Sequence, residues 1–501
     1  MVWPPPPYSA TNTGPPRSRV NERIRVHRTG RFGAVGGGTV YSRHMPDGPL
    51  AVILAAGQGT RMHSSVPKVL HRLGGRPLVL HAIDAAEAAG AGQVVAVVSP
   101  AQPEVRRSLE GRVRCVDQEL PQGTGDAVRS VPPALREAGT VLVLSADVPL
   151  VRPQTLRRLL DEHGQSQDGR ACTLLSVVPD DPSGMGRILR DDDGRVARIL
   201  EEGDIPDDMV IPLECNAGVY VFEGARLGLA LDRLSADNAQ GEYYLTDVIQ
   251  LLDGPVHALL TGEPAEAIGV NDLRQLAAAE AALRRRTLDR LMAAGVAIED
   301  PATTYIDGTV RVAPDSVIRP LSTLRGSTVL GTGCVVGPMA QLENVRAGDR
   351  VVIGSSQLED CALDDDVRIG AYCRVRPGSV LGSGVELGTH AEVKNSTVGA
   401  ASRIGHFSCV LDTDVGRDVN IGAGTVTANY DGRAKHRTTV GDRVFVGTNS
   451  TLVAPVRLGD GCYIGAGSFV DADVPPGALA VGRARQRIIE GWAARRGRVR
   501  A

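Results

Sequence analysis

A glycine-rich segment early in the chain carries the residue types best suited to phosphate chemistry. Gly57 and Gly59 follow an apolar run that ends at Leu54, and the cations Arg61 and Lys68 come shortly after. Glycines let the backbone approach a phosphate closely, and the N–H groups of such a turn attract anions. Arg61 and Lys68 can neutralise the charge of a leaving pyrophosphate. This spacing therefore predicts a triphosphate site rather than an ordinary turn.

A second set of polar residues interrupts an aliphatic pattern near the end of the chain. It consists of Arg376, Lys394, His406 and the pair Asn429–Tyr430. Arg and Lys supply charge-assisted hydrogen bonds to a phosphate, and we expect no acidic partner for these two cations. Histidine has an unperturbed pKa near neutrality, which suits removal of a proton from an amine before acyl transfer. His406 is therefore predicted to be a general base.

An α/β sheet must position the first set. Short apolar runs alternate there with a helical pattern, namely Ala51–Leu54, a helix at Leu78–Ala89, Gln93–Val98 and Val141–Leu144. This βαβ rhythm predicts a Rossmann-like parallel sheet covered by helices. Ligands of such sheets bind beyond the carboxyl ends of the strands, so the turns after Leu54 and at Asp147 should face one crevice.

A repeat must position the second set. An aliphatic residue followed by glycine returns beyond Asp300, often at hexapeptide spacing, as in Leu330–Gly331 and Val336–Gly337. Such a period predicts a left-handed parallel β-helix, in which each aliphatic residue points inward at a corner and the glycine permits the turn. Stacked coils bring residues that are far apart in the sequence onto neighbouring coils, so the polar residues should form one site.

The chain divides into five segments on these patterns. They are an N-terminal extension that is disordered or wrongly assigned (1–46), a sheet domain (47–273), a helical linker (274–294), a β-helix (295–482) and a basic tail (483–501). The extension is rich in Pro and Arg without apolar periodicity, and true initiation near Val40 or Met45 would remove it. The linker holds leucines among Ala, Arg and Glu without Pro or Gly, which favours helix.

The overall composition narrows the possible partners. A chain of 501 residues is too long for one core, and no run of eighteen apolar residues offers a membrane span. Seven arginines against one glutamate in residues 1–44 leave the rest mildly acidic, which argues against a nucleic-acid platform. The eight cysteines lack metal-site spacing, so we expect free thiols in a reducing, cytoplasmic compartment.

The glycine-rich segment and its surroundings resemble the sugar-1-phosphate nucleotidylyltransferases. Further matches to the N-acetylglucosamine-1-phosphate uridylyltransferase branch are Gln118, Gln122–Thr124, Asp147–Leu150 and Asn238–Tyr244. The resemblance implies UTP as co-substrate, with Arg61 and Lys68 catalytic. The residues that it implies for binding UTP or the sugar nucleotide are Leu54, Ala55, Ala56, Gly57, Lys68, Gln118, Gly123, Thr124, Ser145, Asp147, Gly186, Glu201, Asn216 and Asn271.

The resemblance also implies a Mg²⁺ cofactor on Asp147 and Asn271, whose oxygen atoms suit a hard cation. A sugar phosphate is largely dianionic at neutral pH, because its second pKa is about 6, so its oxygen needs no general base. It can attack the α-phosphorus of UTP in line once Arg61, Lys68 and the metal offset the repulsion between anions.

The β-helix extends this resemblance to the bifunctional uridylyltransferase/acetyltransferase family. The matching segments are Arg374–Gly378, Glu392–Lys394, Asn420–Thr425, Asn429–Gly432, Val453–Pro455 and Arg483–Gln486. The second reaction implied is acetylation of glucosamine-1-phosphate by acetyl-CoA, with His406 as base. The amino-sugar phosphate would bind Arg376, Lys394, Cys409 and Asn420. Acetyl-CoA would bind Ala423, Asn429, Tyr430, Thr448, Ala466 and Arg483. The family also implies a homotrimer and a supply of UDP-N-acetylglucosamine for peptidoglycan and other cell-envelope glycans.

The sequence departs from the family pattern at several of these positions. Ala146 and Met185 stand where Gly and an aromatic residue are usual, and Thr448 stands where Ser is usual. Cys409 replaces a Tyr that helps to fix the acceptor, so weaker acceptor binding is expected. We do not expect Cys409 to be a nucleophile, because direct attack by an amine needs no acyl-enzyme.

Two other functions fit parts of the sequence. One is a sugar-1-phosphate nucleotidylyltransferase with a single activity, in which the β-helix serves only for assembly; His406 and Asn429–Tyr430 weigh against it. The other is a non-catalytic protein that binds nucleotide as a signal, which the intact Arg61, Lys68 and Asp147 oppose.

Overall fold

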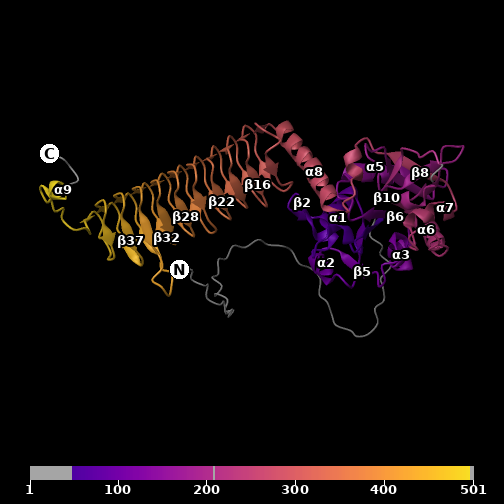
Figure 1. Ribbon diagram of the computed structural model, residues 1–501, viewed down its shortest axis with the longest axis horizontal. Helices are drawn as coiled ribbons and strands as arrows, with labels where there is room; N and C mark the ends of the chain where they lie inside the picture. The colour runs from indigo at the N-terminus through magenta and orange to yellow at the C-terminus, as the bar shows by residue number, and fades with distance from the viewer. Residues whose placement is uncertain (1–47, 207–208, 497–501) are drawn as a thin grey trace, which may run out of the picture. The chain divides into compact units, whose positions relative to one another are not determined.

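A computed structural model describes residues 48–206 and 209–496 (Figure 1). The predicted N-terminal extension, 1–46, lies outside these residues, as do the last five residues of the basic tail. Within the described part of the chain, no helix is long and apolar enough to cross a membrane.

The first domain is built on a nine-stranded sheet, whose main order is β11-β7-β10-β6-β1-β4-β5. Its strands are β1 (Leu50–Leu54), β4 (Gln93–Val98), β5 (Arg114–Asp117), β6 (Thr140–Ser145), β7 (Cys172–Val177), β8 (Arg187–Arg190), β9 (Val196–Leu200), β10 (Cys215–Glu223) and β11 (Val256–Leu260). β1 pairs in parallel with β4 and β6, as predicted. β10 runs antiparallel to β6 and β7, so the sheet is mixed beyond the strands from which the βαβ pattern was predicted.

Short helices cover both faces of this sheet. They are α1 (Leu78–Ala89), α2 (Pro103–Ser108), α3 (Thr124–Arg129), α4 (Pro133–Arg136), α5 (Pro153–Gly164), α6 (Gly224–Leu231), α7 (Val248–Leu251), η1 (Thr60–Met62), η2 (Lys68–Leu70), η3 (Glu202–Asp204), η4 (Leu245–Asp247) and η5 (Pro264–Ala267), with a hairpin of β2 (Arg72–Leu73) and β3 (Arg76–Pro77). Ile53 of β1 belongs to the same buried cluster as Ile83 of α1, whereas Val52 joins Val128 of α3 in another. Successive residues of a strand point to opposite faces, so β1 is apolar throughout.

Backbone hydrogen bonds bring the ends of three central strands together. The N–H of Ala55 donates to the carbonyl of Val97 at 2.8 Å, and that of Ala146 donates to Leu54 at 3.0 Å. The turn after Leu54 and the turn at Asp147 therefore share one edge of the sheet, as the βαβ pattern predicts.

A long helix, α8 (Leu273–Ala293), follows the sheet domain where the sequence predicts one. The Asp272 carboxylate caps its first turn by accepting two backbone N–H bonds of 2.8 Å. Arg286 donates to a backbone carbonyl of the first domain at 2.6 Å, while Leu288 and Leu291 belong to the buried core of the β-helix. The helix thus contacts both domains.

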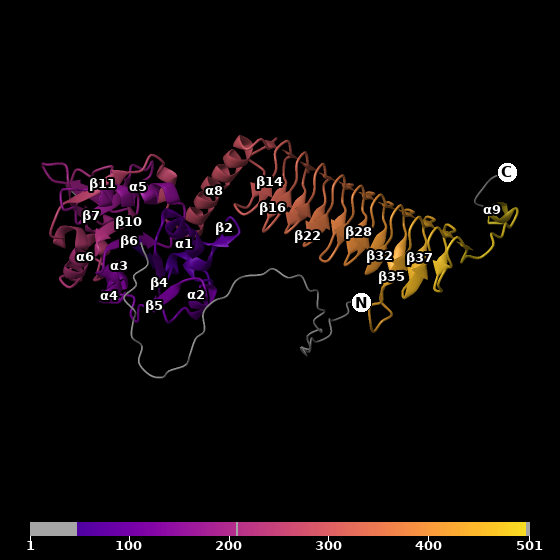
Figure 2. The same cartoon turned by 180° about the vertical axis from the view of Figure 1, so that it is seen from behind.

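The β-helix consists of three parallel sheets (Figures 1 and 2). The first contains β12 (Ala297–Ile298), β15 (Val317–Ile318), β18 (Val335–Val336), β21 (Val352–Ile353), β24 (Arg368–Ile369), β27 (Glu386–Leu387), β30 (Arg403–Ile404), β33 (Asn420–Ile421), β36 (Phe445–Val446), β39 (Tyr463–Ile464) and β41 (Leu479–Ala480). The second contains β13 (Tyr305–Ile306), β16 (Thr323–Arg325), β19 (Gln341–Glu343), β22 (Gln357–Glu359), β25 (Arg374–Val375), β28 (Glu392–Lys394), β31 (Cys409–Leu411), β34 (Val426–Ala428), β37 (Thr451–Val453) and β40 (Phe469–Val470). The third contains β14 (Arg311–Val312), β17 (Val329–Leu330), β20 (Arg346–Ala347), β23 (Ala362–Leu363), β26 (Val380–Leu381), β29 (Thr397–Val398), β32 (Thr413–Val415), β35 (Thr438–Val440) and β38 (Val456–Leu458), and a short helix, α9 (Trp492–Arg495), follows.

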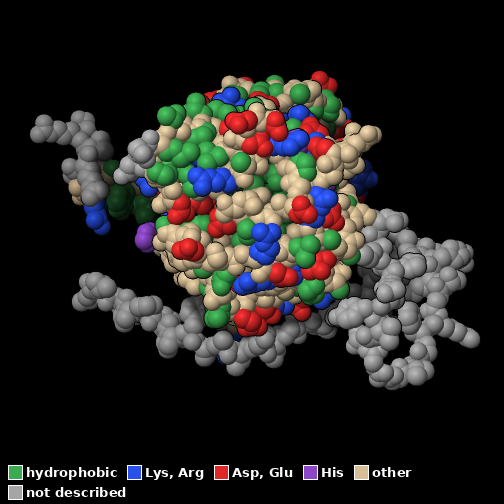
Figure 3. Space-filling view, turned by 90° about the vertical axis from the view of Figure 1, so that its right-hand side faces the viewer, with side chains coloured by type: hydrophobic (Ala, Val, Ile, Leu, Met, Phe, Trp, Pro, Cys, Tyr) green, Lys and Arg blue, Asp and Glu red, His purple; other side chains and the backbone are tan. Residues whose placement is uncertain are grey.

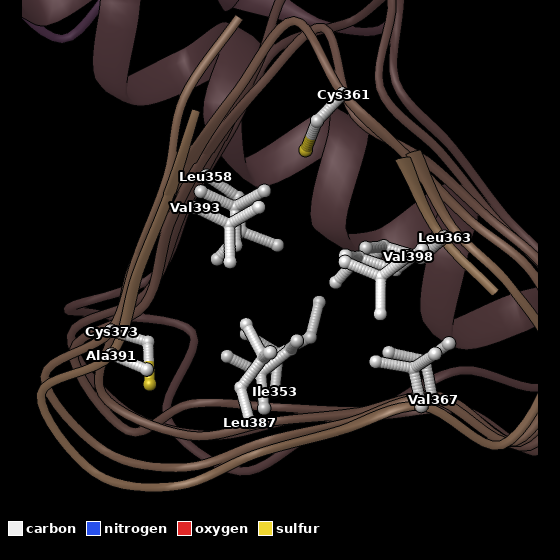
Figure 4. Packing of buried hydrophobic residues seen from close by; sticks show 14 of the residues in the cluster. Ile353, Leu358, Cys361, Leu363, Val367, Cys373, Leu387, Ala391, Val393 and Val398 are labelled. Atoms are coloured by element: carbon white, nitrogen blue, oxygen red, sulfur yellow. The ribbon is translucent and has the colours of Figure 1, made fainter. Parts of the chain in front are cut away.

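Aliphatic side chains fill the interior of the β-helix. Figure 4 shows Ile353, Leu358 and Leu363 pointing inward from the three sides of one coil. The sequence analysis placed the repeating aliphatic residue at a corner, and this was wrong in detail. Val336, for example, ends strand β18, and Gly337 begins the turn that follows. An inward-facing residue on each strand gives the core a continuous stack of apolar side chains along the coils.

Charged side chains of both signs are interspersed on the face drawn in Figure 3.

Candidate active sites

The first candidate site lies at the carboxyl ends of β1, β4 and β6. Two adjoining cavities of about 450 and 460 Å³ open there. Residues that line both are Leu54, Thr124, Ser145 and Asp147. A ligand with two parts could therefore place one part in each cavity and its reacting atoms beside Asp147.

The glycine-rich turn forms one wall of the first cavity. Gly57, Gly59 and Lys68 line it together with Gln118. Gly59 has a φ of 64°, and a Cβ there would lie 2.5 Å from the Cβ of Lys68. Only glycine fits this left-handed position beside the lysine. The turn thus brings backbone N–H groups and an ammonium to one cavity, as a phosphate site requires.

An ionic centre joins residues that are far apart in the sequence. The Lys68 Nζ donates to Asp147 Oδ2 at 2.5 Å and to Asn271 Oδ1 at 3.2 Å. The Ser145 hydroxyl donates to Asp147 Oδ1 at 2.5 Å. Burial favours a higher pKa for Asp147, but the Lys68 ammonium and the Ser145 hydroxyl outweigh it and lower that pKa. Asp147 is therefore a carboxylate at neutral pH. Asp147 and Asn271 both accept hydrogen bonds from the Lys68 ammonium.

The opposite wall of the first cavity is held by hydrogen bonds. The buried Gln118 donates from Nε2 to the carbonyl of Gly123 at 3.0 Å and to Asp126 Oδ2 at 2.9 Å. Thr124 Oγ1 accepts the N–H of Leu245 at 3.0 Å. These bonds fix the two predicted UTP-binding side chains, Gln118 and Thr124, before any ligand arrives.

The second cavity is lined by Met185, Gly186, Glu201 and Asn216. Glu201 accepts the Thr246 hydroxyl at 2.8 Å, and burial raises the pKa of Glu201 above its usual value. Hydroxyl, amide and carboxyl groups that converge on one cavity suit a sugar with several hydroxyl groups.

Asn216 has a partner in this cavity that the sequence analysis did not identify. Its Nδ2 lies 2.6 Å from the hydroxyl of Tyr220, which accepts this hydrogen bond. Burial raises the pKa of Tyr220, so the phenol is neutral. The two residues lie four apart on β10, on either side of a register shift in its pairing with β7, and both line this cavity.

The second candidate site lies along one corner of the β-helix. At this corner, a backbone N–H of each coil donates to the carbonyl of a residue on the coil before it. The donor and acceptor pairs are Phe407 and Thr389 (3.0 Å), Gly424 and His406 (2.8 Å), Asn449 and Ala423 (2.8 Å), and Gly467 and Thr448 (2.7 Å). We call Thr389, His406, Ala423, Thr448 and Ala466 the corner column. His406 therefore shares one edge with three of the predicted acetyl-CoA residues.

Two residues of the preceding coil hold the ring of His406. Its Nδ1 lies 2.9 Å from the Thr389 backbone nitrogen, which donates to it, and 3.0 Å from Thr389 Oγ1. A Cβ on Gly388 would lie 2.8 Å from this Nδ1, so the glycine makes room for the ring. His406 is itself exposed. Its imidazole thus lies against the helix on one side and faces solvent on the other.

A cation cluster lies where β25 and β28 end, and it consists of Arg376, Lys394 and Lys435. The Lys435 ammonium and the Arg376 guanidinium lower the pKa of Lys394. The expectation of no acidic partner was wrong, because Arg376 Nη1 donates to Glu392 Oε1 at 2.9 Å. Glu392 pairs with Arg374 on the neighbouring coil, and this register brings its side chain within reach of Arg376. The sequence analysis did not identify Lys435.

Comparison with known proteins covers both sites. A model of the MobA-like NTP transferase domain matches residues 51–288, and a model of the hexapeptide repeat of succinyl-transferase matches residues 437–472. The bifunctional protein GlmU of Heliobacterium modesticaldum is 43% identical over 450 residues, which cover 89% of this chain and 98% of that protein. GlmU of Kineococcus radiotolerans is 46% identical over 456 residues, or 89% and 92% of the two chains. The chain belongs to the GlmU family of bifunctional proteins. It is an enzyme with a nucleotidyltransferase domain followed by a hexapeptide-repeat acyltransferase domain.

Two residues implied by the GlmU resemblance lie away from the first site's cavities. Arg61 is exposed on η1, and Ala55 is buried with 1% of its surface accessible. Neither lines the two cavities. The other implied residues of this site, including Asn271 and Glu201, line one cavity or both.

The structure also separates some of the acyltransferase residues that the GlmU resemblance groups together. Asn429 donates to Asp412, which accepts a further bond of 2.5 Å from Asn395, and Asp412 faces Lys394. Asn429 therefore belongs with the cation cluster and not with the corner column. Tyr430 and Arg483 are exposed outside the column as well.

Cys409 lies on β31, between the corner column and the cation cluster. It is half-buried on β31 and pairs with Glu392 of the neighbouring coil. Burial raises the pKa of the Cys409 thiol, so it is not a thiolate at neutral pH. All eight cysteines are free.

Proposed function

We propose that this GlmU-family enzyme catalyses two consecutive reactions of UDP-N-acetylglucosamine synthesis. It acetylates glucosamine-1-phosphate with acetyl-CoA, then transfers UMP from UTP to N-acetylglucosamine-1-phosphate and releases diphosphate. The product supplies peptidoglycan and other cell-envelope glycans. The observation that carries this proposal is the presence of two separate sites in one chain, the Lys68–Asp147–Asn271 centre and the corner column with its cation cluster.

For uridylyl transfer, the nucleotide occupies the first cavity and the sugar phosphate the second. Lys68 lies where the two cavities meet and offsets the repulsion between the phosphates. We assign a Mg²⁺ ion to Asp147 and Asn271, because their oxygen atoms already converge on one cation, the Lys68 ammonium. When bound, the ion would neutralise phosphate charge. Arg61 is exposed and acts only if its side chain turns toward the leaving diphosphate.

For acetyl transfer, the phosphate of the amino sugar binds the cations Arg376, Lys394 and Lys435. Its amine attacks the thioester carbonyl of acetyl-CoA, His406 takes a proton from the nitrogen, and the CoA sulfur leaves as a thiolate that is then protonated. The CoA follows the corner column past Ala423, Thr448 and Ala466. We assign Cys409 and Asn420 to acceptor binding, with Asn429 beside them, and Tyr430 and Arg483 to CoA.

We make three further proposals, on the assembly, the location and the domain limits of the protein. We propose a homotrimer, because His406 and the neighbouring Thr448 and Ala466 are exposed on one chain and a second copy would cover a CoA bound there. We propose a cytoplasmic location, which suits eight free cysteines. We also retain the domain limits 47–273, 274–294 and 295–482.

Two single substitutions test the assignment of activities to sites. Asp147→Asn should lower uridylyl transfer by about 10²- to 10³-fold and leave acetylation near normal, because it removes the anionic ligand of the first centre. His406→Ala should lower acetylation by about 10²- to 10⁴-fold and spare uridylyl transfer. Thiol release from acetyl-CoA and diphosphate release from UTP measure the two activities separately.

Controls for these variants are Asp193→Asn and His257→Ala, which alter the same residue types away from both sites. Loss of both activities in either test variant, from a protein that remains folded, would contradict the two-site assignment. A wild-type chain that never releases thiol would instead favour a nucleotidylyltransferase whose β-helix only assembles subunits.

A further inference from the structure

Among the residues that the structure describes, only Thr389 hydrogen-bonds the imidazole of His406, and it does so through two groups. Its backbone N–H donates to Nδ1 over 2.9 Å, and its Oγ1 lies 3.0 Å from the same nitrogen. No residue in the described ranges hydrogen-bonds Nε2. Two groups of different chemistry thus face one ring nitrogen, while the other nitrogen is left for a substrate.

The two groups favour opposite tautomers of the ring. A backbone N–H can only donate, so its bond to Nδ1 requires a lone pair there and places the proton of the neutral ring on Nε2. In that tautomer Nε2 has no lone pair and cannot accept a proton from an amine. A hydroxyl can donate or accept, because its hydrogen rotates. Of the two groups, only Thr389 Oγ1 can therefore accept a hydrogen from Nδ1.

We infer that Thr389 is a positioning residue whose hydroxyl supports the form of His406 that carries hydrogen on Nδ1. This form gives up the backbone bond from the Thr389 N–H to Nδ1. Nδ1–H instead donates to Thr389 Oγ1, and the Nε2 lone pair faces the acceptor amine. When the amine proton moves to Nε2, the imidazolium keeps its Nδ1–H bond to the hydroxyl. This inference rests on the proposed acetyl transfer and adds a residue that the sequence patterns did not indicate.

The surroundings contain other groups that could influence the ring. A titratable neighbour on the preceding coil is His390, whose ring stacks on that of Phe407 at a centroid distance of 5.0 Å and is tilted against that of Tyr372 at 5.1 Å. On strands of the same coils are Glu386, Glu392 and Arg403. Neither a carboxylate nor a carbonyl of the described residues is hydrogen-bonded to Nδ1, so none of these groups replaces the hydroxyl.

The test compares Thr389→Val, which keeps the side-chain shape and removes the hydroxyl, with Thr389→Ser, which keeps the hydroxyl. In the full-length chain, Thr389→Val should lower kcat for acetylation at neutral pH by about 10- to 100-fold, with little change in KM for either substrate. The deficit should shrink as the pH rises, because the free amine needs no base. Thr389→Ser should restore most of the rate, and uridylyl transfer should stay unchanged in both variants.

A control on the third sheet is Thr397→Val, which removes an exposed hydroxyl. Wild-type kcat in Thr389→Val would overturn the inference, as would an equal deficit at every pH, a rise in KM alone or failure of Thr389→Ser to recover. If the wild-type chain and Thr389→Ser both fail to acetylate, the proposed function itself is wrong.

Discussion

At the scale of single residues, each site depends on a titratable group whose state is set by its neighbours. Asp147 stays ionised because Lys68 and Ser145 outweigh its burial, whereas burial raises the pKa of Glu201. The two carboxyl groups line the same cavity, yet their surroundings shift them in opposite directions. Asp147 is thereby suited to binding cations, and Glu201 carries a free-energy cost when it ionises.

Because of this cost, the effect of Glu201→Gln on stability should depend on pH. The pKa of Glu201 is raised in the folded state, so its ionisation destabilises the fold as the pH rises above the usual value of 4.5. Glutamine can still accept the Thr246 hydroxyl without a charge. Thermal unfolding of the first domain should show a higher Tm for the variant at pH 7.5, and the gain should vanish near pH 4. A gain that is equal at both pH values would contradict the burial argument.

Single-residue patterns identified much of the two sites but not the contacts between them. Gly59 and Asp147 could be predicted because each follows the end of an apolar strand, and Lys68 because it comes shortly after the same glycine-rich turn. Lys435, Thr389 and the partner of Arg376 could not, since these contacts depend on which residues face each other on neighbouring coils. That register is a property of the stacked coils and not of any local motif.

At the scale of elements, the turn before α3 shows how the backbone fixes the nucleotide cavity. Gly123 lies at the start of this helix with a φ of 116°, and a Cβ there would be 2.5 Å from the carbonyl oxygen of Tyr243. Gly90, which ends α1, has a φ of 102° but no atom within 4 Å of the same position. A side chain at Gly90 would therefore meet only backbone strain, whereas a side chain at Gly123 would meet both backbone strain and a steric clash.

Alanine at each glycine tests this distinction. Gly90→Ala should cost about 1 kcal/mol of stability through its left-handed conformation alone. Gly123→Ala should cost more and should lower uridylyl transfer, because the Tyr243 backbone and the Gln118–Gly123 hydrogen bond must shift. Chemical unfolding and diphosphate release measure the two effects. Equal losses of stability in both variants would show that the clash is relieved at no cost.

The kinds of element were easier to predict than their directions. Apolar runs located β1, β4, β6 and α1, and the hexapeptide period located the β-helix. The antiparallel direction of β10 was not predicted, because strand direction depends on how the chain crosses the sheet and not on local composition. The inward residue of each repeat lies on a strand and not at the corner. The aliphatic–glycine motif spans both the end of a two-residue strand and the start of the turn, so the motif alone does not show which of the two holds the aliphatic residue.

At the scale of the whole molecule, the chain holds two sites with no described residue in common. The first is built on strand ends of a mixed sheet, and the second on a corner of stacked coils. Acetylated sugar phosphate must therefore leave one site before it reaches the other.

The most direct test of this account follows thiol and diphosphate in one reaction of the full-length chain with glucosamine-1-phosphate, acetyl-CoA and UTP. We predict that thiol release needs the sugar phosphate but not UTP, and that diphosphate appears after a lag and only when acetyl-CoA is present. Diphosphate release from added N-acetylglucosamine-1-phosphate without any thiol release from glucosamine-1-phosphate would contradict the account, and it would leave the β-helix as an assembly domain.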